Sequence, residues 1–110
     1  MSSWLIRMVD AWLNNNKSLT YNVTSPRGRR MTFVFRYVFV ASSWRAYIVS
    51  SPSYGSRSSS LHDSHRYYDS SCNQYYVCWT AKLTCIEQIT EVSKMWASAT
   101  AKYIDTGIGF

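Results

Sequence analysis

Apolar and aromatic residues dominate the segment from Met31 to Val40. Four aromatic side chains occupy every second position: Phe33, Phe35, Tyr37 and Phe39. Successive side chains of a β-strand point to opposite faces, so these four rings share one face. The other face carries Val34, Val38 and Val40, with Arg36 as the polar exception. Because both faces are largely apolar, the pattern predicts a central strand that is covered on both sides.

Two shorter alternations flank this strand. Leu19, Tyr21 and Val23 alternate with polar residues before it, and Trp44, Ala46 and Ile48 alternate with Arg45, Tyr47 and Val49 after it. Residues 25–28 (SPRG) are a turn signal, since proline fixes one dihedral and glycine accepts a positive one. Short connections join antiparallel neighbours, so we expect a meander of three strands. Residues 74–80 (QYYVCWT) are a fourth strand candidate.

Apolar residues at helical spacing mark both ends of the chain. The first stripe consists of Trp4, Leu5, Met8, Val9, Trp12 and Leu13. The second consists of Ile86, Ile89, Val92, Trp96, Thr100, Tyr103 and Ile104. Each stripe predicts an amphipathic helix. Thr84 and Glu87 have the spacing of a capping box for the second helix, and Gly107 is its predicted end.

The predicted order of elements is helix, three strands, long loop, strand, helix. This order is typical of an α+β domain, with an antiparallel sheet of three to four strands and an N-terminal and a C-terminal helix packed against it. A chain of 110 residues is large enough for one core and too small for two. We therefore expect a single domain over residues 1–110, with a long polar loop at about 51–73.

Positive charge is concentrated in the middle of the chain. The formal net charge is +6 and the pI is about 9.4. Residues 27–66 contain seven arginines, no lysine and a single acid, Asp63. Guanidinium groups bind phosphates and carboxylates bidentately and stack on aromatic rings. The expected partner is therefore anionic: a nucleic acid, a nucleotide or an acidic protein surface. A merely solvated basic surface is the alternative.

The polar segment from Ser50 to Asn73 holds the main candidate site. Irregular loops of this length are usually functional or disordered. Its serines favour disorder, but its tyrosines do not, so we expect a partly ordered loop folded over the sheet, with a helical turn near residues 61–67. The candidate ligand or anion site comprises Arg45, Tyr47, Tyr54, Arg57, His62, His65 and Arg66. In this hypothesis the cations bind the anion and the tyrosines stack a base. A solvated loop is the alternative.

A second basic candidate is the sequence RGRR at the tip of the first predicted hairpin. Arg27, Arg29 and Arg30 are candidate phosphate contacts there, because a basic tip that projects from a sheet can reach a nucleic-acid backbone. A solvated turn is the alternative.

Two chemical alternatives involve the sequence HDSH. If the protein is an enzyme, His62 and His65 are the candidate acid and base of phosphodiester cleavage, because histidine titrates near neutral pH. With Cys72 and Cys78 they have the ligand types of a zinc site, but only HDSH has paired-ligand spacing. No glycine-rich phosphate loop, nucleophile elbow or paired carboxylate motif is present. The sequence therefore favours a protein without enzymatic activity, metal site or cofactor.

The cysteines and the apolar runs indicate the compartment. Cys72, Cys78 and Cys85 are odd in number and lack the spacing of a disulfide framework, so free thiols are expected. No apolar run is long enough to span a bilayer, and the first sixteen residues lack the apolar core and cleavage site of a signal peptide. We expect a cytoplasmic protein without a membrane partner. A homodimer is one possible oligomeric state.

Two partial resemblances concern the order of the elements. The order helix, three strands, helix is similar to that of double-stranded RNA-binding domains, although only Lys82 stands where those domains have a lysine-rich helix start, and the long loop is extra. Aromatic strands followed by TAKLTCIEQITEVSKMW resemble the sheet-plus-helix DNA-binding modules of phage integrases, in which a strand leads into a Thr-capped helix. Both are analogies of fold and carry no specific function.

The leading hypothesis is a small non-enzymatic protein whose arginine and aromatic face binds a nucleic acid or a nucleotide. The runner-up is a protein-interaction module, such as a small inhibitor from a mobile element that covers an acidic surface of a larger partner. A small histidine-dependent nuclease is the third.

Overall fold

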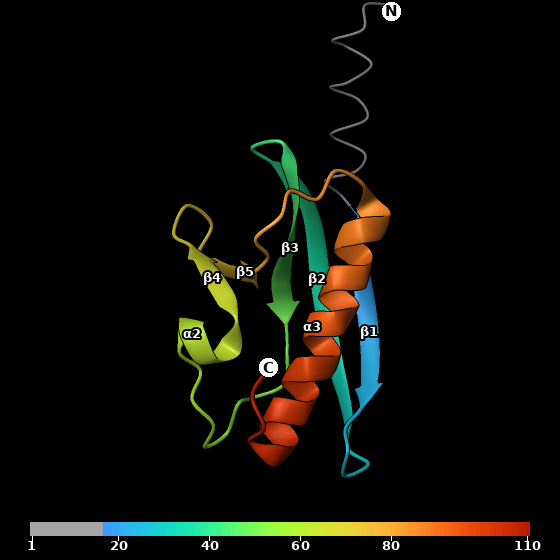
Figure 1. Ribbon diagram of the computed structural model, residues 1–110, viewed down its shortest axis with the longest axis vertical. Coiled ribbons are helices and arrows are strands. Elements are labelled where there is room, and N and C mark those ends of the chain that lie inside the picture. The colour runs from blue at the N-terminus through green and yellow to red at the C-terminus, as the bar shows by residue number, and fades with distance from the viewer. Residues whose placement is uncertain (1–16) are drawn as a thin grey trace, which may run out of the picture.

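The computed structural model describes residues 17–110. They form one five-stranded antiparallel sheet with a long helix on one face (Figure 1). The elements are β1 (Ser18–Thr24), β2 (Arg30–Val40), β3 (Ser43–Ser50), α2 (Leu61–Ser64), β4 (Arg66–Asp69), β5 (Gln74–Val77) and α3 (Ile86–Thr106). The strand order is β1-β2-β3-β5-β4. The α+β class with a C-terminal helix is confirmed, and the predicted N-terminal helix lies outside the described residues.

Two tight turns build the predicted meander of β1, β2 and β3. At the first, the Ser25 N–H donates to Arg29 O at 2.8 Å and the Gly28 N–H to Ser25 O at 2.9 Å. Gly28 has a φ of 84°, which glycine adopts without strain. At the second, Ala41 and Ser42 have φ values of 51° and 67°. Positive φ at both central residues is the type I′ geometry, whose twist matches that of the flanking strands.

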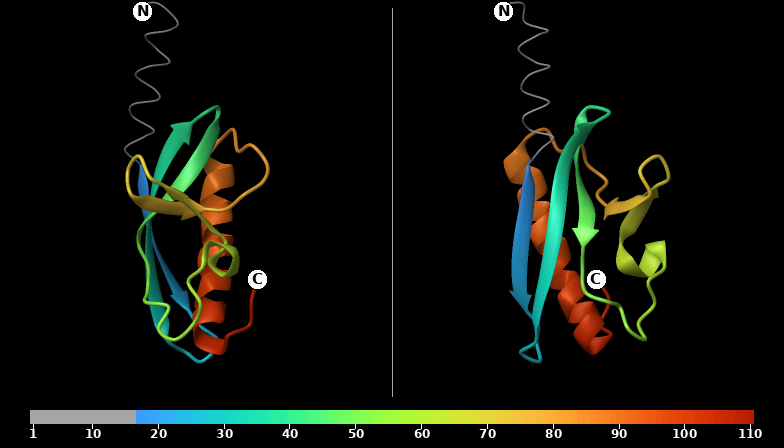
Figure 2. Two further views of the ribbon diagram at one scale, coloured as in Figure 1. Left: turned by 90° about the vertical axis from the view of Figure 1, so that its left-hand side faces the viewer. Right: turned by 180° about the vertical axis from the view of Figure 1, so that it is seen from behind.

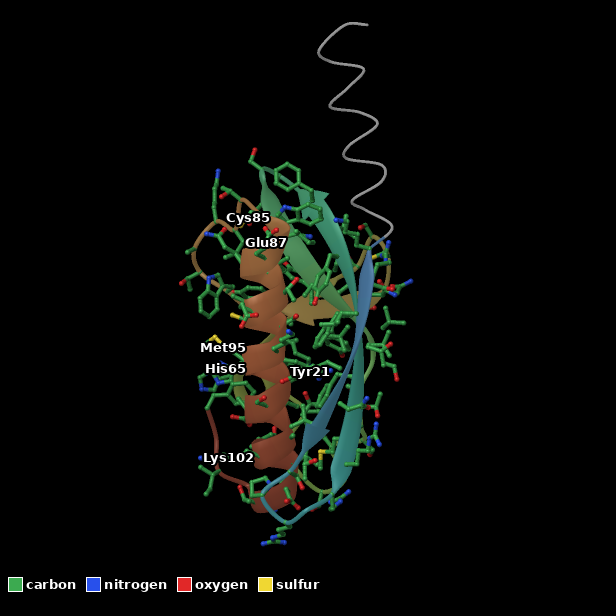
Figure 3. All side chains as sticks on the ribbon, turned by 90° about the vertical axis from the view of Figure 1, so that its right-hand side faces the viewer. Tyr21, His65, Cys85, Glu87, Met95 and Lys102 are labelled. Carbon is green, nitrogen blue, oxygen red and sulfur yellow. The ribbon has the colours of Figure 1, made fainter. Side chains whose placement is uncertain are left out.

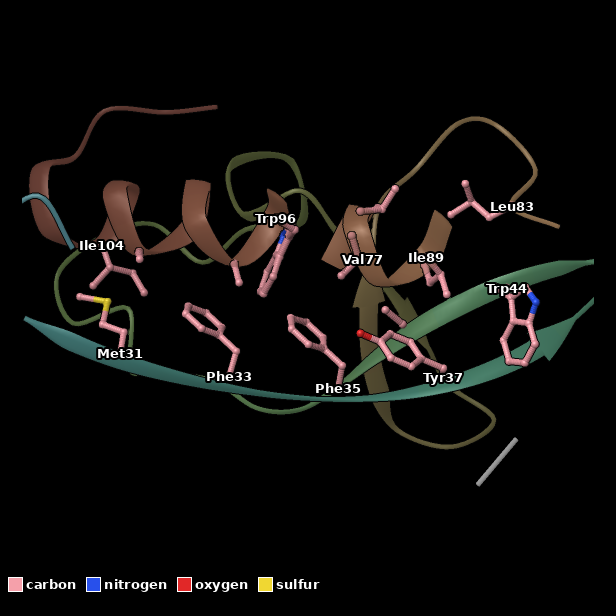
Figure 4. Close-up of a cluster of buried hydrophobic side chains, with 14 residues drawn as sticks. Met31, Phe33, Phe35, Tyr37, Trp44, Val77, Leu83, Ile89, Trp96 and Ile104 are labelled. Atoms are coloured by element: carbon pink, nitrogen blue, oxygen red, sulfur yellow. The ribbon is translucent and has the colours of Figure 1, made fainter. Parts of the chain in front are cut away.

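The core lies between α3 and one face of the sheet (Figure 4). Four β2 side chains on this face are at most 3% exposed: Met31, Phe33, Phe35 and Tyr37. The Trp96 indole of α3 stands edge-on to the rings of Phe33 and Phe35, at centroid distances of 5.8 and 5.9 Å. The prediction that this side of β2 meets the C-terminal helix is confirmed for these residues. Phe39, near the end of the strand, is instead 41% exposed and lies 5.5 Å from Trp44, centroid to centroid.

The opposite face of the sheet is open in the described part of the chain. The views in Figure 2 show α3 on one side of β1, β2 and β3 and no described helix on the other. The predicted cover of β2 on both sides is therefore absent among residues 17–110. The side chains of Arg36 and Val38 are half-buried there because neighbouring strands shield them, and Tyr47, which pairs with Arg36, is only 4% exposed.

The segment predicted as a long polar loop at 51–73 contains regular structure. Residues 51–60 are irregular, but α2 follows, and β4 pairs with β5. The sheet therefore has five strands instead of the predicted three to four. β4 was missed because it has only four residues, with Tyr67 and Tyr68 adjacent, and so shows no run of alternation. The helical turn predicted near residues 61–67 is present as α2.

The N-terminus of α3 differs slightly from the prediction, and its C-terminus agrees. The N-cap is Cys85, and Gln88 Oε1 accepts hydrogen bonds from the Thr84 and Cys85 N–H groups at 2.9 and 3.4 Å. Gln88 thus performs the role predicted for Glu87. Gly107 ends the helix with a φ of 78°. No helix within residues 17–110 is long and apolar enough to cross a membrane.

Candidate functional site

A row of four side chains crosses the open face of the sheet. Arg36 of β2 pairs with Tyr47 of β3, Tyr47 with Tyr76 of β5, and Tyr76 with Tyr67 of β4. The Arg36 guanidinium carbon lies 5.2 Å from the Tyr47 ring centroid, and the ring centroids of Tyr47–Tyr76 and Tyr76–Tyr67 lie 5.6 and 5.5 Å apart. We call these four residues the arginine–tyrosine row. Its side chains are in contact from β2 to β4, with Tyr47 buried at 4% exposure and Tyr67, at the end of the row, 42% exposed.

Arg45 of β3 lies over this row. Its guanidinium carbon is 4.3 Å from the Tyr76 ring centroid, and Nη1 donates to Tyr47 Oη at 3.1 Å and to Asp69 Oδ2 at 3.3 Å. The Tyr47 hydroxyl also donates to Asp69 Oδ2, at 2.7 Å. The network therefore holds β3, β4 and β5 together through polar groups, and the Arg45 side chain remains 28% exposed.

The network also shifts the pKa values of its acidic members. The pKa of Asp69 falls to about 2, chiefly because the Ser71 hydroxyl donates to its carboxylate, with the Tyr47 hydroxyl, the Ser71 N–H and the charge of Arg45 adding to this. Burial raises the pKa of Tyr47, and the hydrogen bond to Asp69 raises it further. Near neutral pH Asp69 is ionised and neutralises part of the Arg45 charge.

A pocket of about 260 Å³ opens beside the row, between β3, β5 and the segment that leads to α3. The strands β3 and β5 pair only at Tyr47 and Tyr76, so they diverge on one side of this pair. The segment after β5 closes the gap, because the Trp44 N–H donates to Leu83 O and the Leu83 N–H to Ser43 Oγ, each at 2.9 Å. We call this space the β3–β5 pocket.

The lining of the β3–β5 pocket combines aromatic rings with positive charge. Its rings and cations include Arg45, Tyr67, Tyr76, Trp79 and Lys82. Tyr67 and Trp79 are 42% and 43% exposed, so their rings are accessible from solvent. No acidic residue lines this pocket. Aromatic faces beside cations are the arrangement that binds a flat ring carrying negative charge.

The predicted ligand site is divided by the structure. Arg45 and Tyr47 belong to the open face, as described above. The guanidinium of Arg57 lies at the C-terminus of α3, where Nε donates to Ile104 O at 3.2 Å and Nη2 to Asp105 O at 3.4 Å. These hydrogen bonds hold Arg57 at the C-terminus of α3, away from Arg45, which lies over Tyr76 on the open face.

Arg66 is buried on the α3 side of the sheet. It is 8% exposed, and its guanidinium carbon lies 3.9 Å from the Tyr75 ring centroid and 5.0 Å from that of Tyr54. Nε donates to Ser64 Oγ and Nη2 to Ser59 O, both at 2.8 Å. These contacts hold the irregular segment, α2 and β4 together. Arg66 and Tyr54 thus pack on each other, while ligand binding by either stays a prediction.

The two histidines lie together at α2. Their ring centroids are 6.4 Å apart, and they line a pocket of about 300 Å³ with Arg66 and Cys78. The Phe110 ring stacks on His65 at 4.3 Å. In this pocket the Arg66 guanidinium is hydrogen-bonded to Ser64 Oγ and Ser59 O, and the nuclease hypothesis stays a prediction. Within residues 17–110 no three His, Cys, Asp or Glu side chains gather as metal ligands.

An apolar groove of about 160 Å³ lies beside α3. Its lining includes His65, Cys78, Trp79, Met95, Trp96 and Phe110. Figure 3 shows Met95 and His65 on one side of α3 and Tyr21 on the other. Met95 and Phe110 are 59% and 46% exposed, so this groove presents apolar surface to solvent.

The basic hairpin tip does meet part of the predicted loop. Arg27 and Arg29 line a cleft with Tyr54 and Arg57, whereas Arg30 does not line it. Residues from two predicted sites, distant in sequence, are therefore neighbours in space. The β1–β2 turn, which lines this cleft, and the β2–β3 turn, which lines the β3–β5 pocket, lie at opposite ends of the sheet (Figure 1).

Several residues of the open face escaped sequence reasoning. Tyr67 and Asp69 were missed with β4, because that strand was not predicted. Tyr76 belonged to a predicted strand. Its alternation with Tyr75 indicated that the two side chains point to opposite faces of the sheet, but not which of them lies on the open face. The strand predicted over residues 74–80 ends at Val77, so Trp79, which was expected to continue its alternation, lies with Lys82 in the irregular segment after β5. No protein-family model, curated protein or solved structure matches the chain.

Proposed function

We propose that the protein binds a nucleic acid or a nucleotide on the open sheet face, with a base in the β3–β5 pocket. The observation that carries this proposal is the guanidinium of Arg45, stacked 4.3 Å from the ring centroid of Tyr76 at the wall of that pocket. Bases stack on aromatic rings and on guanidinium planes, and phosphates pair with cations. Both kinds of group meet at this place.

The size of the pocket supports binding of part of a ligand. Pockets for whole drug-sized ligands have volumes of about 300–1,000 Å³, and the β3–β5 pocket measures about 260 Å³. A single flat base suits such a space, with its sugar and phosphate outside. Arg45 and Lys82, both in the lining, then supply positive charge for the phosphate.

A pair of lysine variants tests the proposal. Lys82 and Lys102 are both exposed, but only Lys82 lines the pocket, whereas Lys102 lies on α3. Lys82→Ala should weaken binding of a short single-stranded oligonucleotide and lower the salt slope by about one, while Lys102→Ala should leave both unchanged. Titration by fluorescence anisotropy at several salt concentrations measures both quantities. No binding at low salt, or equal effects of the two variants, would contradict the proposal.

A protein-interaction module is the second candidate, favoured by the apolar groove beside α3. Exposed aromatic residues and methionine are enriched at protein interfaces, and Met95, Phe110 and Trp79 are exposed there. Self-association that is insensitive to salt and lost in Met95→Glu would support this candidate, including a homodimer. Sedimentation at several protein concentrations measures it. Oligonucleotide binding that survives Met95→Glu and is weakened by Lys82→Ala supports the first candidate.

A further inference from the structure

Three chain segments meet at the lower end of the molecule in Figure 1, and their residues line a basic cleft. They are the β1–β2 turn, the irregular segment before α2, and the C-terminus of α3. The cleft has a volume of about 400 Å³, and its charged lining consists of Arg27, Arg29, Arg57 and Asp105. We call it the hairpin cleft. Its three arginines and one acid leave a formal surplus of two positive charges.

Asp105 joins two walls of the hairpin cleft, because it lies on α3 and contacts both arginines of the β1–β2 turn. Its side chain is 2% exposed, Oδ2 accepts a hydrogen bond from the Arg27 N–H at 2.8 Å, and Oδ1 lies 3.8 Å from Arg29 Nη1. Burial opposes ionisation, but hydrogen bonds from Ser25 and the Arg27 N–H and the charges of both arginines lower its pKa below the usual value. The buried carboxylate is therefore ionised and fixes the basic turn against α3.

Arg57 is held rigidly in the same cleft. Its Nε and Nη2 donate to carbonyl oxygens of the last turn of α3. Arg57 lines the cleft, and these two hydrogen bonds fix the place of its positive charge there. The guanidinium packs against Gly107, where a Cβ would lie 2.9 Å from Nη1, and the φ of 78° at this position favours glycine. The orientation of the guanidinium is thus set before any ligand binds.

The arginines from the turn contribute the remaining charge. The Arg29 side chain is 64% exposed, and the Arg27 side chain is exposed as well. An exposed guanidinium retains donors and can rearrange around a ligand, whereas Arg57 provides a fixed contact. Three guanidinium groups, two from the β1–β2 turn and one from the segment before α2, surround a tetrahedral oxyanion better than a planar carboxylate, which one guanidinium satisfies bidentately.

We propose that the hairpin cleft binds an oxyanion of the phosphate type. The surplus of two positive charges matches a phosphate dianion. The group can be free phosphate or a phosphate of a nucleic acid, since both present the same oxygens. This site is independent of the β3–β5 pocket: it uses none of the same residues.

Neighbouring arginines of the turn provide a matched test. Arg29 lines the cleft and Arg30 does not, although both are exposed and both variants remove one charge. The measurement is a titration with inorganic phosphate, followed by the amide chemical shifts of residues 27–29 and 55–57. Arg29→Ala should raise the dissociation constant about tenfold, because it removes about one charge-assisted hydrogen bond. Arg30→Ala should change it less than about twofold. Lys82→Ala should leave phosphate binding intact, which separates this site from the proposed function.

A second arm distinguishes the two sources of the phosphate. If Arg29→Ala also weakens oligonucleotide binding more than Arg30→Ala does, the cleft binds nucleic-acid phosphate; if only inorganic phosphate is affected, the ligand is the free ion. Either result supports the proposal. It is overturned if Arg29→Ala and Arg30→Ala behave alike in both titrations, including the case in which no phosphate binds at low salt.

Discussion

The guanidinium carbon of Arg66 lies 3.9 Å from the ring centroid of Tyr75, on the face of the sheet that packs towards α3. No carboxylate among the described residues forms an ion pair with Arg66. Its charge is instead compensated by two aromatic rings and by the oxygens of Ser59 and Ser64. A buried arginine of this kind acts as a structural link, because several elements converge on one side chain.

Replacement of Arg66 should therefore reduce stability. Arg66→Lys retains the charge but loses the planar stacking and the paired hydrogen bonds, and should lower the free energy of unfolding by about 2 kcal/mol or more. The control is Arg30→Lys at an exposed position, which should change stability by less than about 0.5 kcal/mol. Urea denaturation measures both. Equal stability of the two variants would show that Arg66 has no such role.

The Tyr54 hydroxyl is buried and lacks a hydrogen-bond partner among the described residues. The Tyr103 hydroxyl, whose ring packs against that of Tyr54, donates to Ser58 O at 2.8 Å. Tyr54→Phe should therefore leave stability unchanged or raise it, since it removes an unsatisfied polar group, while Tyr103→Phe should lower it by about 1 kcal/mol. Thermal denaturation of both variants provides the comparison. A large loss in Tyr54→Phe would mean that this hydroxyl has a partner.

The β2–β3 turn should be improved by glycine. Ser42 has a φ of 67°, a conformation that is unfavourable for a residue with a Cβ. Ser42→Gly should raise the free energy of unfolding by up to about 1 kcal/mol. Gly28→Ala is the reverse control: its φ is 84° with open space around the position, so backbone strain alone should destabilise it by a similar amount. Urea denaturation should therefore show a higher free energy of unfolding in Ser42→Gly and a lower one in Gly28→Ala. A change in the same direction in both variants would contradict the turn geometry.

Stability should depend on pH through Asp69. The pKa of Asp69 is about 2 in the folded protein and about 3.9 in an unfolded chain. Because the folded value is lower, ionised Asp69 stabilises the fold above about pH 4, and this contribution is lost as the pH falls from about 4 to 2. Ser71→Ala, which removes the largest cause, should move the folded pKa upward. Carboxyl chemical shifts measured from pH 6 to 1.5 give the Asp69 pKa in the folded wild type and in Ser71→Ala. An Asp69 pKa near 3.9 in the wild type would contradict the network.

Long elements were predictable because several signals agreed. In β2 the alternation of Phe33, Phe35 and Tyr37 was repeated often enough to fix both the strand and the face that meets α3. In β4 four residues between serine-rich segments carried no comparable signal, so Tyr67 and Asp69 were lost from the candidate site. Short strands depend on their partners, and β4 exists as a strand through its pairing with β5.

Side-chain direction explains the remaining differences. Arg57 and Arg66 are close in sequence and of like charge, which suggested one anion site. The strand geometry of β4 turns Arg66 towards the core, while the C-terminus of α3 binds Arg57 through its free carbonyls. Conversely, Arg29 and Arg57 are neighbours only because Asp105 fixes the β1–β2 turn to α3. Contacts that depend on a third element cannot be inferred from charge spacing.

The proposed ligand mode is a base stacked in the β3–β5 pocket beside Arg45 and Tyr76. Its test is a titration with a short single-stranded oligonucleotide, followed by amide and side-chain chemical shifts. The proposal predicts the largest saturable changes at Tyr47, Tyr67, Tyr76 and the Trp79 indole, with little change on the outer side of α3 at Glu91 and Lys102. Changes confined to α3, or no saturable change at low salt, would contradict it.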